Sequence, residues 1–223
     1  MTHSNIVSTL YQLCYVFEDD VYSDTTLIGV LPFAHLYGAC ILIHLTLIKG
    51  ASTVIMQNFD LSMFCKLIQD YKVNVIPIVP PIVLSLVNNY NNPNYSQYDL
   101  SSLQFCLITA APLSEELAEN FTYMFNVPIR PCYGLTETTT MTHLVETDDI
   151  VPGSIGKILP NIECKIIDEK GEELEYNQPG ELCIRGPNIM KGYLNDEEGT
   201  NKCIDSEGWL HTGDLATVDE SGG

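Results

Sequence analysis

The stretch CYGLTE, from Cys132 to Glu137, has the residue types that phosphate chemistry needs. It combines an aromatic ring at Tyr133, a glycine, a hydroxyl at Thr136 and a carboxylate at Glu137. A hydroxyl can donate to a phosphate oxygen, and a neighbouring carboxylate can hold a hard cation. The stretch therefore predicts a phosphate and Mg²⁺ site, with a plain threonine-rich turn as the alternative.

A second candidate lies between an apolar run and a long apolar stretch, at residues 32–38. It carries His35 and Tyr37 just after an expected strand. In parallel sheets, ligands bind beyond the carboxyl ends of the strands. A histidine there can also be a core residue that is satisfied by backbone carbonyls, and both interpretations remain open.

Two further loops have the composition of a nucleotide site. Ala110 and Ala111 follow an expected strand, and such small side chains let a flat ligand approach the backbone. Residues 208–214 contain the only tryptophan and end in Asp214, whose carboxylate could hold two neighbouring ribose hydroxyls. The alternative for Ala110 and Ala111 is an ordinary tight loop, and the alternative for residues 208–214 is a structural cap.

The elements that position these residues follow from hydrophobic periodicity. We expect helices over 5–17, 35–48, 60–71, 81–88 and 114–125, and strands over 26–31, 51–56, 75–79, 103–109 and 129–132. Asp60 and Ser114 are the expected N-caps. Alternating strands and helices predict an α/β fold, with a mostly parallel sheet covered by helices on both faces.

The pattern changes after about residue 150 to short strands bounded by turns. We expect strands over 164–168, 180–185 and 215–219. Residues 141–223 are accordingly predicted to form a smaller β-rich subdomain, a distorted barrel, after an α/β part at 1–140.

Composition excludes several classes of function. Ten Lys and Arg against 29 Asp and Glu give a formal charge of −19, which argues against nucleic acid or anionic lipid as a partner. The eight cysteines are spread singly, without the spacing of metal ligands, so we expect free thiols and no cysteine metal site. The oligomeric state is not indicated.

Residues 27–48 carry no acidic or basic side chain apart from histidine and are long enough to span a bilayer. Pro32 divides them, which favours a buried strand followed by a helix. The first ten residues lack the basic start and apolar block of a signal peptide. We therefore expect an intracellular protein, cytoplasmic or peroxisomal, without a transmembrane segment.

The motifs YGLTE, GELCIRGPNIMKGY and GWLHTGD, in this order, closely resemble those of the adenylate-forming ligases. This superfamily includes acyl-CoA synthetases, 4-coumarate:CoA ligases and firefly luciferase, and the resemblance covers essentially the whole chain. It implies that ATP and a small carboxylic acid give an acyl-adenylate and pyrophosphate. In most members the CoA thiolate then displaces AMP to form a thioester. The implied cofactors are ATP, Mg²⁺ and CoA.

The resemblance also implies residue roles for the nucleotide. Tyr133 would stack on adenine beside Gly134, with Ala110 and Ala111 lining the same slot. Thr136 would bond the α-phosphate, and Glu137 would hold Mg²⁺. Asp214 would bind the ribose hydroxyls.

On the acyl side, His35 and Tyr37 would stand at the pocket near the reacting carboxylate. Cys132 replaces the glycine of many CoA ligases, so the floor of the acyl pocket is expected to differ. Residues 57–59 read Gln-Asn-Phe where 4-coumarate ligases carry a lysine that helps to hold CoA. These departures leave the identity of the acid open.

The resemblance further implies that this is an internal fragment, because the family's glycine-rich phosphate loop and its small C-terminal domain with the adenylation lysine are absent. The complete enzyme would activate a fatty or aromatic carboxylate. The alternative is a catalytically incompetent truncated product or a weak nucleotide-binding module.

Overall fold

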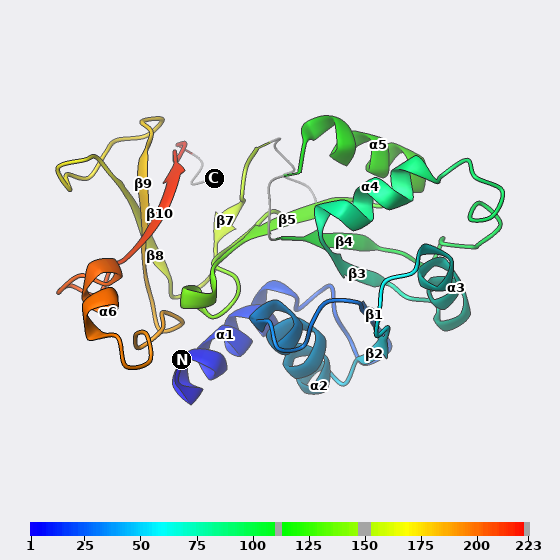
Figure 1. The fold of residues 1–223 in the computed structure, drawn as a ribbon, viewed down its shortest axis with the longest axis horizontal. Coiled ribbons are helices and arrows are strands. Elements are labelled where there is room, and N and C mark those ends of the chain that lie inside the picture. Colours follow the sequence, from blue (N-terminus) through cyan, green and yellow to red (C-terminus); the bar gives the residue numbers. More distant parts are fainter. Residues whose placement is uncertain (110–112, 147–152, 221–223) are drawn as a thin grey trace.

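The computed structural model describes residues 1–109, 113–146 and 153–220, and it contains two β-sheets (Figure 1). The first sheet has the order β2-β1-β3-β4-β5-β6-β7, in which β1 to β5 are parallel and β6 and β7 are antiparallel. Its strands are β1 Thr26–Gly29, β2 Ser52–Ile55, β3 Val75–Ile78, β4 Phe105–Ile108, β5 Ile129–Tyr133, β6 His143–Leu144 and β7 Lys157–Ile158. The predicted mostly parallel sheet is confirmed.

Helices cover both faces of this sheet. They are α1 His3–Val16, a π-helix at Gly38–Leu45, α2 Thr46–Lys49, α3 Leu61–Tyr71, α4 Pro80–Asn88 and α5 Glu115–Phe125. Alternate strand residues face opposite sides: Leu107 packs with α1 and the π-helix, whereas Cys106 and Ile108 pack with α3, α4 and α5. Figure 1 shows α1 and α2 on one side of the sheet and α4 and α5 on the other.

Local signals define the helix starts. The side chains of Asp60 and Ser114 accept hydrogen bonds from the backbone N–H of Met63 and Leu117, as predicted for N-caps. The first turn of α4 contains Pro80, whose missing N–H costs nothing at that position.

The helix predicted over 35–48 is instead a π-helix followed by the short helix α2. The reason lies in side chains that bond to its backbone carbonyls. The His44 ring lies 2.7 Å from the Ala39 carbonyl, and the Thr53 hydroxyl donates to the Leu42 carbonyl. Such contacts compete with the regular helical ladder and widen the turn.

The second sheet is antiparallel, with the order β10-β9-β8. Its strands are β8 Glu163–Ile167, β9 Gly180–Arg185 and β10 Leu210–Ala216. Within the described residues it is an open sheet of three strands where a distorted barrel was expected. Helix α6 Glu197–Cys203 precedes β10 and was not predicted.

The strand predicted over 215–219 was misplaced, because β10 begins at Leu210 and ends at Ala216. A register shift between His211 and Leu215 interrupts the alternation that would have revealed it. Strands β6 and β7 were missed because each is only two residues long. The division of the chain at residue 140 stays a prediction, and the change from one sheet to the other comes later, between Ile158 and Glu163.

Over the ranges that the structure describes, no helix is both long enough and apolar enough to cross a membrane. The uncharged residues 27–48 form β1 and the two helices that follow it.

Candidate active site

Two residues from different sheets meet beyond the end of β5. The Tyr133 hydroxyl donates a hydrogen bond of 2.6 Å to Asp214 Oδ2 on β10. Burial raises the pKa of Tyr133, and the bond to Asp214 raises it further, so this phenol stays protonated. The contact places an aromatic ring and an exposed carboxylate side by side.

Tyr133 and Asp214 line a cavity of about 630 Å³ between the two sheets. A cavity of this size lies within the range of small-molecule and cofactor sites. The rest of its wall comes from the segments that follow β6 and precede β7, from β7 itself, from β9 and the turn before it, and from the end of β10 with the residues that follow. The pair therefore lines a cavity large enough for a small-molecule ligand.

The carboxylate of Glu137 lies on the single 3₁₀ turn Thr136–Thr138 that follows β5. Its Oε1 accepts a hydrogen bond of 2.8 Å from the Tyr193 hydroxyl, and its backbone carbonyl accepts from the Met190 N–H at 2.8 Å. The hydroxyl of Thr136 is on an exposed residue of the same turn. Hydroxyl and carboxylate oxygens are the donor set that Mg²⁺ prefers, so these residues fit that ion.

Asn188 supports the turn Thr136–Thr138 through hydrogen bonds. It is fully buried, and its Nδ2 donates to the Thr138 carbonyl at 2.9 Å. The Asn188 carbonyl accepts from the Thr139 hydroxyl at 2.6 Å. Asn5 of α1 in turn donates to the carbonyls of Pro187 and Ile189.

Asn188 and Tyr193 belong to the motif GPNIMKGY, to which sequence analysis assigned no residue role. The Pro-Asn and Lys-Gly pairs of this motif are typical of turns, so their composition gave no sign of this role. Asn188 and Tyr193 support the turn Thr136–Thr138 through contacts between residues about fifty positions apart in the sequence. Only the fold brings these residues together.

Gly134 acts through close packing. A Cβ atom at this position would lie 1.8 Å from the Thr140 carbonyl oxygen, so no side chain fits without moving the backbone. The glycine therefore lets the strand and the returning turn pack closely together.

The residues predicted for the acyl side lie near one another. The Tyr37 hydroxyl donates to the Leu107 carbonyl at 3.1 Å, and the Cys132 thiol donates to the Ile108 carbonyl at 3.3 Å. Both side chains are buried, so they can shape a pocket wall but offer no free polar group. Burial raises the pKa of Cys132 to about 12, which keeps it a neutral thiol.

His35 is exposed, and its Nδ1 accepts from the Tyr37 N–H at 3.1 Å. The core-histidine alternative is thereby excluded. Ala110 and Ala111 lie outside the described residues, so their predicted place beside Tyr133 stays a prediction.

A family model described as AMP-binding enzyme matches residues 1–194. The chain belongs to the AMP-binding enzyme family. Among relatives of this AMP-binding chain, a 4-coumarate–CoA ligase from Pinus taeda is 42% identical over 99% of the chain. A probable 4-coumarate–CoA ligase 1 from Dictyostelium discoideum is 38% identical over 100% of the chain.

The AMP-binding chain spans only about two-fifths of these relatives, 42% and 40% of their lengths. Solved structures agree with the fold. ATP-bound MatB from Rhodopseudomonas palustris matches all of the chain with a TM-score of 0.90, at 27% identity and over 43% of its own length. O-succinylbenzoate coenzyme A synthetase from Bacillus subtilis, in complex with ATP and magnesium, matches 99% of the chain and 44% of its own length, with a TM-score of 0.86 and 27% identity.

Proposed function

We propose that the protein to which this chain belongs is an ATP-dependent acid–thiol ligase that joins a fatty or aromatic carboxylic acid to CoA through an acyl-adenylate. The observation that carries this proposal is the pair Tyr133 and Asp214 on the wall of one cavity, with the Thr136–Glu137 turn following Tyr133 closely in the chain. The relatives named 4-coumarate–CoA ligase favour an aromatic acid.

The nucleotide would be held through its adenosine. The Tyr133 ring would stack on adenine, Gly134 would keep the returning turn packed against the end of β5 next to it, and Ala110 and Ala111 would line the same slot. The Asp214 carboxylate accepts a hydrogen bond from the Tyr133 phenol, and ribose hydroxyls can donate hydrogen bonds to it in the same way. An exposed Asp214 can therefore accept from the ribose while it keeps the tyrosine in place.

The phosphates would be held at the turn after β5. The Thr136 hydroxyl would donate to an α-phosphate oxygen, and the Glu137 carboxylate, oriented by Tyr193, would hold Mg²⁺. When bound, the ion would offset the negative charge that gathers on the phosphates. Because the chain has a formal charge of −19, a polyanion such as ATP would need a local cationic group or a metal ion at its site.

In the first step, a carboxylate oxygen of the acid attacks the α-phosphorus, and the bond to the departing pyrophosphate breaks. The carboxylate is already ionised at neutral pH, so the main task of the protein is to align the two substrates. We place His35, Tyr37 and Cys132 at the acyl pocket. In the second step, the CoA thiolate attacks the acyl carbonyl, and AMP leaves with the electron pair of the broken bond.

The free cysteines favour a reducing compartment for this enzyme, the cytoplasm or the peroxisome. All eight are unpaired thiols in the structure. Disulfides are rare in such compartments.

The test uses the complete product of the gene with ATP, Mg²⁺, CoA and a panel of fatty and aromatic acids that includes 4-coumarate. We expect acid-dependent release of pyrophosphate and formation of a thioester. Glu137→Gln and Asp214→Asn should lower turnover, whereas Asp24→Asn, a change at an exposed carboxylate on the loop after α1, should not. Absence of pyrophosphate with every acid would contradict the proposal.

A further inference from the structure

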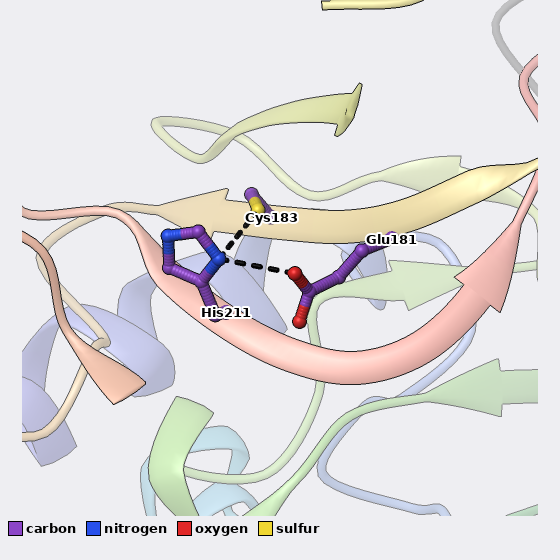
Figure 2. A group of neighbouring side chains, drawn as sticks. All are labelled: Glu181, Cys183 and His211. Atoms are coloured by element: carbon purple, nitrogen blue, oxygen red, sulfur yellow. Dashed lines mark hydrogen bonds and ion pairs between the residues drawn. The ribbon is translucent and has the colours of Figure 1, made fainter. Parts of the chain in front are cut away.

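Three possible metal ligands lie together on the second sheet: Glu181, Cys183 and His211 (Figure 2). Glu181 and Cys183 are alternate residues of β9, so their side chains point to the same face. His211 on β10 pairs directly with Cys183. The ligand atoms of the three side chains all lie within 4.8 Å of one another.

We propose that Glu181, Cys183 and His211 form a binding site for a borderline divalent cation of the Zn²⁺ type, with a water molecule as the fourth ligand. A carboxylate, a thiolate and an imidazole are the ligands that Zn²⁺ takes in tetrahedral sites. The site is chemically different from the Mg²⁺ site proposed at Glu137, because Mg²⁺ selects oxygen ligands alone. The proposal does not depend on the ligase activity.

The two distances from the His211 ring to the other ligand atoms fit this coordination. His211 Nδ1 lies 3.6 Å from Cys183 Sγ and 3.1 Å from Glu181 Oε2. Tetrahedral Zn²⁺ bonds place nitrogen about 3.6 Å from sulfur and about 3.3 Å from oxygen. A small rotation of the half-buried Glu181 carboxylate would complete the arrangement.

The surroundings resemble the outer shell of a metal site. His211 Nε2 faces Asp205 Oδ2 at 3.7 Å, and the other oxygen, Oδ1, accepts from two backbone N–H groups. The second oxygen of Glu181 accepts from the Gly213 N–H at 3.0 Å. Ligand histidines commonly direct their other ring nitrogen at a carboxylate, and ligand carboxylates are themselves hydrogen-bonded.

Access and charge are also suitable. Cys183 is fully buried against Ile167 and Trp209, whereas His211 and Glu181 are each about one-third exposed, at 31% and 32% of the side chain. An ion can therefore enter from the His211 side and meet a thiol that is protected from solvent. Binding would replace the S–H bond with a metal–sulfur bond and release the proton to solvent.

Sequence spacing could not reveal this group. Two of its members are on one strand, and the third is 28 residues away on the neighbouring strand. The expectation of no cysteine metal site rested on local spacing, which does not detect ligands that come from neighbouring strands.

The experiment uses metal-free protein, produced from the complete gene, and Co²⁺ as a spectroscopic probe. We expect one Co²⁺ per chain, with a thiolate-to-metal charge-transfer band and the intense visible bands of tetrahedral coordination. Added Zn²⁺ should remove both. A spectrum without the charge-transfer band would overturn the proposal.

Variants locate the ion. Cys183→Ser should abolish the charge-transfer band, and His211→Gln should lower the affinity for Zn²⁺ by at least about tenfold, because even outer-shell changes commonly cost that much. Cys164→Ser removes an exposed thiol from the neighbouring strand β8 and should change neither quantity. If Cys183→Ser does not fold, the Zn²⁺ affinity of His211→Gln alone tests the proposal, since this change leaves the buried core intact. Unchanged affinity in His211→Gln, or equal loss in Cys164→Ser, would overturn the proposal.

Discussion

The hydrogen bond from the Tyr133 hydroxyl to Asp214 Oδ2 joins the end of the first sheet to a strand of the second. The two residues are 81 positions apart in the sequence. Asp214 lies within the register shift of β10 between His211 and Leu215. The wall of the cavity therefore depends on the register of a strand that belongs to another sheet.

The Tyr133 ring is expected to contribute more to ATP binding than its hydroxyl. Base stacking on an aromatic side chain is worth about 1–3 kcal/mol, so Tyr133→Ala should raise the Kd for ATP by about 5- to 100-fold. Tyr133→Phe keeps the ring and loses the bond to Asp214, and we expect a smaller change. Calorimetric titration of the complete protein measures both, and equal affinities of Tyr133→Ala and the parent would refute the stacking role.

Tyr193 is expected to position the Glu137 carboxylate. Its bond to Glu137 raises the pKa of Tyr193 to about 12, so the hydroxyl remains a donor throughout the working pH range. Tyr193→Phe should raise the Mg²⁺ concentration for half-maximal pyrophosphate release by about three- to tenfold, as expected for a hydrogen bond to a charged group that is partly exposed. Tyr176→Phe, at another exposed tyrosine, is the matched control. An identical Mg²⁺ dependence in both variants would show that Tyr193 has no positioning role.

The ion pair between Arg130 and Asp20 is expected to stabilise the fold. The Arg130 side chain is only 4% exposed, and its Nη1 donates a hydrogen bond of 2.5 Å to Asp20 Oδ2. Its guanidinium also lies over the rings of Phe17 and Phe105. Asp20→Asn would leave a buried charge without a counter-charge, at a cost of about 3 kcal/mol. Urea denaturation measures this free energy of unfolding. Asp19→Asn, at the preceding carboxylate, should cost much less, and equal losses would argue against the pair.

His143 is expected to make stability fall in mild acid. Burial lowers the pKa of His143 to about 4 in the folded chain, from an ordinary value of 6.5. The contribution of neutral His143 to the free energy of unfolding is therefore complete above pH 6.5. This contribution is lost as the pH falls toward 4, where the loss reaches about 3 kcal/mol. His143→Gln should flatten the dependence of the unfolding free energy on pH between 7 and 4. His3→Gln changes an exposed histidine and should leave the slope as it was.

Elements with a strong local signal were predicted well. Strands β3 and β9 and helices α3 and α5 were placed to within a few residues, because apolar periodicity and the caps at Asp60 and Ser114 are properties of neighbouring residues. Strand β10 was misplaced because its bulge disrupts the periodic signal. The π-helix was missed because one of the contacts that widen its turn, the bond from the Thr53 hydroxyl to the Leu42 carbonyl, comes from a separate element.

By itself the sequence determined the order of strands and helices, the family motifs, and the residue types at Tyr133, Glu137 and Asp214. These properties are local, since they depend on side chains a few positions apart. Only the tertiary structure decided which of those residues meet. The contact of Tyr133 with Asp214 and the group of Glu181, Cys183 and His211 both arise from strand register and a bulge. Register is set by packing across the whole sheet, and no short segment carries that information.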